Sequence, residues 1–172
     1  MKEIKVLIDE EKLNNRIKEI AKQISEDYKN EEIVLVCILK GAVYFVADLS
    51  RLITDSNVIL DFMKVSSYGD LTETTGKVEL KLDLNTNIED KNVIIIEDII
   101  DSGYTLNYLY DYLKSKNPKT LKLCALLDKK ERREKEIKVD YTGFEIENKF
   151  VVGYGLDYAD KYRNLPYIGY IE

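Results

Sequence analysis

The sequence predicts an α/β fold in which a mainly parallel twisted sheet is flanked by helices. Two segments carry this prediction. Each is an apolar run typical of a buried strand, followed by a small polar turn and then by apolar residues at helical spacing. The first strand covers residues 33–39 and its helix begins near Ala42; the second covers residues 93–96 and its helix begins near Leu106. Successive strand, turn and helix units build parallel sheets with helices on both faces.

Length and composition narrow the function classes. A chain of 172 residues suits one domain, residues 1–172, with a sizeable core. The net charge of −6 argues against broad nucleic-acid binding, and the absence of histidine excludes Ser-His-Asp hydrolysis and imidazole acid-base chemistry. Cys37 and Cys124 lie in apolar runs, so we expect two reduced core thiols. With no secretory leader or membrane-length apolar run, we expect a soluble, cytoplasmic protein.

The remaining elements follow from local patterns. Residues 6–8 form a short apolar segment, Asp9 is a suitable N-cap, and a helix should follow and stop near Asn30. Its core face carries Leu13, Ile17, Ile20, Ala21, Ile24 and Tyr28. Residues 58–65, 77–82 and 120–127 are predicted strands. The eleven residues 66–76 are too polar for a sheet and favour a mobile functional loop.

An acidic pair follows the strand at residues 93–96. We expect the strand to stop there, because the adjacent carboxylates of Glu97 and Asp98 are costly inside a dry sheet. Residues 101–105, Asp-Ser-Gly-Tyr-Thr, then form a turn whose backbone amides lie at the positive end of a helix and suit an anion. Carboxylates beside a phosphate imply a sugar diol, Mg²⁺ or both. Together these features indicate a phosphorylated sugar as ligand.

Residues 93–105 resemble the 5-phosphoribosyl 1-diphosphate (PRPP) signature of the type I phosphoribosyltransferases. The alternative is a flavodoxin-like receiver domain, which also ends apolar strands in acidic residues. A receiver usually carries its acidic pair after the first strand, whereas the pair in this chain lies past mid-chain. The resemblance implies a type I phosphoribosyltransferase fold, with Asp101 as the catalytic acid or base at the purine N7 and Mg²⁺ held near Glu97 and Asp98. It assigns PRPP and its 5′-phosphate to Glu97, Asp98, Asp101, Ser102, Gly103, Tyr104 and Thr105.

Two further segments resemble parts of that family. Leu39-Lys40-Gly41-Ala42 is similar to the diphosphate loop Leu-Lys-Gly-Ser, in which the first peptide bond can be cis. The resemblance implies diphosphate binding by Lys40, Gly41 and Arg163. Ser66, Ser67, Tyr68 and Gly69 resemble the flexible lid loop, which would keep water from a reactive ribosyl cation.

Residues 149–158, Lys-Phe-Val-Val-Gly-Tyr-Gly-Leu-Asp-Tyr, are the strongest marker of the hypoxanthine-guanine branch. The resemblance implies that Lys129 donates to the purine O6, Phe150 stacks on the base and the Val151 backbone reads its edge. It places Asp157 in the purine site and among the metal ligands, with Glu97 and Asp98. A donor at O6 favours 6-oxopurines over adenine. The family also has a small hood, expected here from the N-terminal segment and about residues 129–172.

The resemblance implies an enzyme of purine salvage. It would transfer 5-phosphoribosyl from PRPP to N9 of hypoxanthine or guanine with Mg²⁺ as cofactor, giving IMP or GMP and diphosphate. PRPP and a 6-oxopurine base would be its partners, with no nucleic acid and no membrane, and the family forms homodimers and homotetramers. Two alternatives remain: a preference for another base, including xanthine, and a PRPP-sensing RNA-binding regulator, which the acidic balance disfavours.

Overall fold

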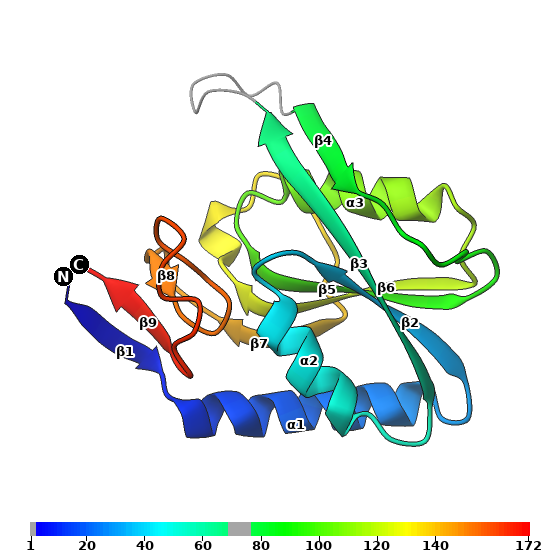
Figure 1. The fold of residues 1–172 in the computed structure, drawn as a ribbon, viewed down its shortest axis with the longest axis horizontal. Helices are drawn as coiled ribbons and strands as arrows, with labels where there is room; N and C mark the ends of the chain where they lie inside the picture. The colour runs from blue at the N-terminus through cyan, green and yellow to red at the C-terminus, as the bar shows by residue number, and fades with distance from the viewer. Residues whose placement is uncertain (1–2, 69–76) are drawn as a thin grey trace.

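The computed structural model describes residues 3–68 and 77–172, and within these ranges its main sheet has six strands (Figure 1). Their spatial order is β4 (Lys77–Leu82), β3 (Asn57–Tyr68), β2 (Glu32–Ile38), β5 (Asn92–Ile100), β6 (Thr120–Asp128) and β7 (Tyr141–Glu145). Neighbouring strands are parallel, except that β3 and β4 are antiparallel. The predicted α/β class with a mainly parallel sheet is confirmed.

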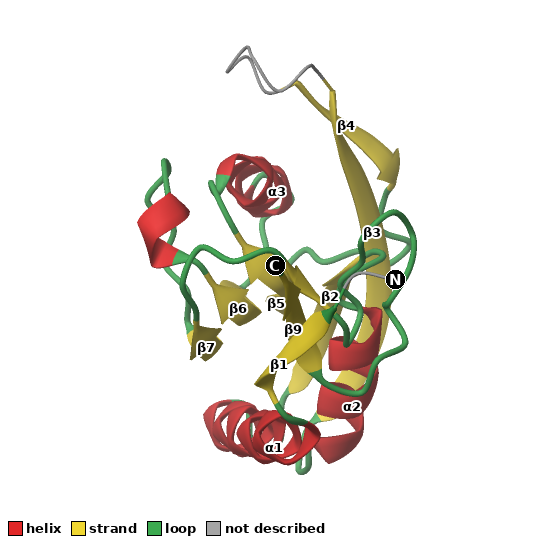
Figure 2. Cartoon of the chain, turned by 90° about the vertical axis from the view of Figure 1, so that its left-hand side faces the viewer, coloured by secondary structure: helices red, strands yellow, loops and turns green. Residues whose placement is uncertain are grey.

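Helices cover both faces of the main sheet. Figure 2 shows α1 (Glu10–Asp27) and α2 (Val43–Leu52) on one side of the strands and α3 (Tyr104–Lys114) on the other. Alternate residues of β2 serve the two faces: Ile33, Leu35 and Cys37 join the core under α1 and α2, while Val34, Val36 and Ile38 join the core under α3. Because both faces are buried, the strand is apolar throughout rather than alternating.

Helix α1 begins and packs as the sequence predicts. The side chain of Asp9 accepts a 2.8 Å hydrogen bond from the backbone amide of Lys12, which satisfies a free amide of the first turn. All six residues of the predicted core face are buried. The helix ends at Asp27, and Asn30 follows with a φ of 62°, in the left-handed region that ends helices.

A second, antiparallel sheet forms the hood. Within the described chain its spatial order is β1 (Ile4–Ile8), β9 (Ile168–Ile171) and β8 (Val151–Val152), which brings the two ends of the chain together (Figure 1). The expected extent of the hood, residues 129–172, is too wide. Strand β7 pairs with β6, with Tyr141 opposite Cys124, and so belongs to the main sheet. That residues 1–172 form a single domain stays a prediction.

Strand β3 is longer than the predicted residues 58–65. It continues to Tyr68, because residues 66–68 pair with β4 in an antiparallel ladder. Three of the four predicted lid residues, Ser66, Ser67 and Tyr68, therefore belong to a strand rather than to a loop. Gly69, the fourth, lies outside the described residues.

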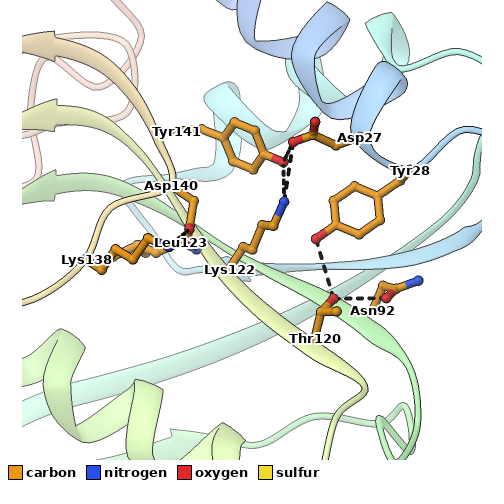
Figure 3. A network of polar contacts seen from close by, with 9 residues as sticks. All are labelled: Asp27, Tyr28, Asn92, Thr120, Lys122, Leu123, Lys138, Asp140 and Tyr141. Atoms are coloured by element: carbon orange, nitrogen blue, oxygen red, sulfur yellow. Dashed lines mark hydrogen bonds and ion pairs between the residues drawn. The ribbon is translucent and has the colours of Figure 1, made fainter.

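A polar network lies at the amino-terminal ends of β5, β6 and β7 (Figure 3). The Lys122 ammonium lies 3.3 Å from the Asp27 carboxylate and 3.2 Å from the Tyr141 hydroxyl, and it sits over the rings of both Tyr28 and Tyr141. Thr120 connects the network to β5, because its hydroxyl donates to the side-chain oxygen of Asn92 at 2.9 Å. The network connects α1 to the amino-terminal ends of β5, β6 and β7. This edge of the sheet is opposite the carboxyl-terminal edge that carries the predicted site.

Both cysteines are free and buried, as predicted: Cys37 lies in β2 and Cys124 in β6. No helix in the described ranges is long and apolar enough to cross a membrane.

Candidate active site

The predicted site residues meet at the carboxyl-terminal edge of the main sheet. Strand β2 leads into the Lys40 loop, β5 into the turn at residues 101–105, and β6 into Lys129. Because these strands are adjacent and parallel, their carboxyl ends share one edge. Such an edge is the usual place for ligands in open α/β sheets.

The turn at residues 101–105 encloses a small cavity of about 120 Å³. Gly103 is the N-cap of α3 and has a φ of 89°, a conformation that suits glycine, and no side chain caps the helix there. The first amides of α3 are therefore left for an external acceptor, as in other anion sites at helix starts. The cavity is lined by Glu97, Ile99, Ile100, Asp101, Ser102, Gly103, Thr105 and Leu106.

The acidic pair lies inside β5 rather than after it, so the expectation that the strand stops at residue 96 is wrong. The ladder to β6 continues, with Glu97 opposite Ala125 and Ile99 opposite Leu127. Glu97 is 9% exposed, and burial together with the charge of Asp98 raises its pKa well above its usual value. The raised pKa reflects the cost of a charged carboxylate at this buried position beside Asp98.

Two glycines bring the separate motifs into direct contact. A Cβ on Gly41 would lie 1.6 Å from Oδ2 of Asp98, and a Cβ on Gly155 would lie 2.0 Å from the carbonyl oxygen of Gly41. Only a residue without a side chain allows these approaches. The peptide bond between Leu39 and Lys40 is cis, as the family resemblance suggests. The loop at residues 39–42, the acidic pair and the Gly155 turn thus form one packed unit.

The cations expected to bind diphosphate are paired with acidic side chains. Lys40 Nζ lies 3.5 Å from Asp160, while Arg163 pairs with Asp157 at 2.9 Å and donates to the Gly155 carbonyl at 2.5 Å. Both cations belong to the same neighbourhood, because Gly155 touches Gly41, next to Lys40. Asp160 was not predicted, and its position three residues after Asp157 is the signal that could have indicated it.

Asp101 and Lys129 also meet. Lys129 is buried, at 7% exposure, and its Nζ lies 3.7 Å from Oδ2 of Asp101. The other carboxylate oxygen accepts a 2.9 Å hydrogen bond from Nε of Arg132. Sequence reasoning missed Arg132, since its run of charges is typical of a solvated loop and carries no sign of a distant partner.

Val151 begins β8 in the hood, and Phe150 comes directly before it. The Phe150 ring is 53% exposed and meets Tyr158 edge to face, with 5.6 Å between ring centroids. Val151 is buried and pairs with Tyr170 of β9. An exposed aromatic ring next to a paired strand can stack on a planar ligand.

The three predicted metal ligands do not form a ready-made cage. In the described part of the chain, no group of three or more His, Cys, Asp or Glu side chains is arranged to hold a metal ion. Asp157 is paired with Arg163, and Glu97 and Asp98 stand side by side in β5. Such a pair suits Mg²⁺ that arrives with phosphate oxygens and keeps several waters, which is how this ion commonly binds.

Comparison with known proteins gives consistent matches. Residues 6–159 match the family described as phosphoribosyl transferase domain. The chain is 46% identical to a hypoxanthine-guanine phosphoribosyltransferase of Bacillus subtilis, covering 98% of this chain and 93% of that protein. A crystal structure of a hypoxanthine-guanine phosphoribosyltransferase from Bacillus anthracis superposes with a TM-score of 0.94 at 53% identity, covering 99% of this chain and 100% of that one.

A third match is to part of a longer protein. The bifunctional protein TilS/HprT of Listeria monocytogenes is 48% identical over 98% of this chain, but the chain spans only 26% of its length.

Proposed function

Because the chain belongs to the phosphoribosyl transferase domain family and, within it, to the hypoxanthine-guanine phosphoribosyltransferases, we propose that it moves a 5-phosphoribosyl group from PRPP to N9 of hypoxanthine or guanine. The products would be IMP or GMP and diphosphate, a reaction of purine salvage. The observation that carries the proposal is the packed unit of Gly41, Asp98 and Gly155, which brings a phosphate turn, a carboxylate pair and two basic groups to one edge.

The phosphoribosyl part of the substrate would lie along the end of β5. The backbone amides and hydroxyls of residues 102–105 take the 5′-phosphate, while Glu97 and Asp98 accept hydrogen bonds from the ribose hydroxyls. Catalysis would be largely positional and electrostatic.

The leaving diphosphate would be held on the other side of the acidic pair. Lys40, the amide groups around Gly41 and Arg163 would exchange their present partners Asp160 and Asp157 for diphosphate oxygens. Once they have made this exchange, the cations stabilise the charge that develops on the leaving diphosphate. Mg²⁺, the cofactor typical of this family, would be held by Glu97 and Asp98, with Asp157 nearby, and when bound it neutralises charge on the diphosphate.

The base would enter between the end of β6 and the hood. Lys129 would donate to O6, Phe150 would stack on the ring and the Val151 backbone would meet its edge. As N9 bonds to C1′, the N7–H bond breaks and its proton passes to a carboxylate oxygen of Asp101, while the electron pair stays on N7. Asp101 is a suitable acceptor, because it directly follows β5 and its carboxylate lies beside Lys129, the proposed partner of O6.

One assay tests the proposal directly. The purified protein is incubated with PRPP, Mg²⁺ and, separately, hypoxanthine, guanine, xanthine and adenine, and the nucleotides are identified by chromatography. We expect IMP and GMP, with little or no AMP. Formation of neither IMP nor GMP would overturn the proposal. We also propose that the protein forms a homodimer or homotetramer. Its molar mass, measured by light scattering during size-exclusion chromatography, tests this.

A further inference from the structure

The two carboxylate oxygens of Asp101 have different neighbours. Oδ1 accepts a hydrogen bond of 2.9 Å from Nε of Arg132. Oδ2 faces Lys129 Nζ at 3.7 Å, which is an ion-pair distance but too long for a hydrogen bond. One oxygen is therefore fixed by a directional contact, and the other is held only loosely.

The backbone that carries Arg132 is attached to the strand end on both sides of Asp101. Arg132 is the last residue of the 3₁₀ helix η1 (Lys130–Arg132), and its amide donates to the Lys129 carbonyl at 3.0 Å. The Lys129 amide donates to Ile100 at 3.0 Å, and the Glu134 amide donates to Ser102 at 2.9 Å. The residues before and after Asp101 are thus both bonded to the segment that places Arg132.

The neighbouring arginine anchors this segment in a different way. Arg133 pairs with Asp128, which is 1% exposed, through Nε at 3.2 Å and Nη2 at 2.6 Å, and its Nη1 donates to the Ile137 carbonyl at 2.7 Å. A two-point contact of this kind fixes geometry as well as charge. Arg133 is therefore a structural anchor, and Arg132 extends from an anchored turn toward Asp101.

From these contacts we infer that Arg132 is a positioning residue for the reaction: it holds Oδ1 of Asp101 so that Oδ2 faces the purine N7. The inference rests on the proposed function. When Lys129 turns to O6 of the base, Arg132 is left as the cation that orients the carboxylate. The N7 proton then passes to Oδ2, and Arg132 takes no proton itself, because a guanidinium stays charged throughout.

A double-mutant cycle tests whether Arg132 acts through Asp101. We compare wild type, Arg132→Ala, Asp101→Asn and the double variant by steady-state kinetics with hypoxanthine and PRPP. Arg132→Ala should lower kcat about 10- to 100-fold, the effect of a misplaced catalytic group, with the KM for PRPP within about twofold. Asp101→Asn should lose about 10²- to 10⁴-fold. The double variant should be no slower than Asp101→Asn, because the same function is already lost.

Two controls separate positioning from a merely structural role. Lys130→Ala alters the same 3₁₀ helix, but Lys130 pairs with Glu145, so its kcat should stay at the wild-type value. Millimolar guanidinium should restore part of the turnover of Arg132→Ala and none of that of Asp101→Asn. Thermal unfolding of each variant reports whether the fold is retained.

The outcomes are distinct. A wild-type kcat in Arg132→Ala overturns the inference, as does a further loss in the double variant or a loss that guanidinium does not restore. If the wild type forms no IMP or GMP, the proposed function fails instead.

Discussion

The α-carbon of Gly155 packs against the carbonyl oxygen of Gly41, so that a Cβ on Gly155 would lie 2.0 Å from that oxygen. Gly41 in turn packs against the Asp98 carboxylate. The turn at Gly155 therefore packs against the loop at residues 39–42, and a change at Gly155 should affect the proposed diphosphate site.

Gly155→Ala should weaken PRPP binding. The new methyl group would push on Gly41, and the φ of 102° at Gly155 is strained for any residue with a Cβ. We expect the free energy of unfolding to fall by about 1–3 kcal/mol and the KM for PRPP to rise roughly fivefold or more. Urea unfolding and steady-state kinetics measure the two effects.

Gly153→Ala is the matched control for Gly155→Ala. Gly153 has a φ of 97° and a Cβ there would lie 2.1 Å from the Tyr167 carbonyl, so the strain is similar but is directed away from Gly41. It should lower stability without a comparable change in the KM for PRPP. Equal KM values in the two variants would show that the contact with Gly41 has no part in PRPP binding.

Lys129→Ala should lower the preference of the protein for 6-oxopurines over adenine. A lost hydrogen bond from a charged donor costs about 1.5–3 kcal/mol, so kcat/KM for hypoxanthine should fall about 10- to 100-fold. The value for adenine should change little, since adenine offers no acceptor at position 6. The ratio of kcat/KM for the two bases is the measurement, with Lys130→Ala as a neighbouring lysine control. An unchanged ratio would remove Lys129 from base recognition.

Lys122→Met should destabilise the protein without altering catalysis. The substitution removes a cation that lies between two tyrosine rings and pairs with Asp27 (Figure 3). Lys122 lies near the amino-terminal end of β6, whereas the candidate site lies at the carboxyl-terminal ends of the strands. We expect a loss of about 1–2 kcal/mol in the free energy of unfolding. Lys22→Met is the control, because its pair with Glu26 is exposed and should be worth less than about 0.5 kcal/mol. A fall in kcat for Lys122→Met would contradict this separation.

The buried thiols should make stability fall in alkali. Burial raises the pKa of Cys37 from its ordinary 9.0 to about 12, and it raises the pKa of Cys124 as well. Since the folded state holds these protons more tightly, their contribution is complete below pH 9 and is lost as the pH rises toward 12. Urea unfolding between pH 8 and 11 measures how the free energy of unfolding changes with pH. Cys37→Ala should make this change smaller, because it removes the contribution of one of the two thiols.

Thiol labelling gives an independent check on the same two residues. Neither Cys37 nor Cys124 should react with a disulfide reagent in the native protein at pH 8, because the thiolate is the reactive form and both groups are buried. Both should react after addition of denaturant. Rapid labelling of the native state would show that one of them is accessible.

The parts of the fold that could be predicted are those whose chemistry is local. The turn after β5 could be predicted locally, since Gly103 allows the left-handed conformation at the start of α3 and Ser102 and Thr105 are small and polar. The N-cap at Asp9 is equally local, because its partner is the amide of Lys12.

The parts that could not be predicted depend on partners far away in the sequence. Residues 128–133 form one run of charges, yet Arg132 binds Asp101 and Arg133 binds the buried Asp128. Likewise, the ladder between β5 and β6 continues through Glu97, which a rule about carboxylates in strands does not predict. The assignment of residues 141–145 to the hood failed because strand order is not visible in a single strand.

The order of strands in the hood has a consequence for how that sheet folds. Strand β9 lies in the middle of the sheet, with β1 on one side and β8 on the other, although it is the last of the strands in the described chain. Ile4 pairs with Ile171, so the sheet forms only when two segments that are far apart in the sequence meet. Contacts of this kind form more slowly than local ones, so we expect the β1–β9 pairing to be a late step in folding.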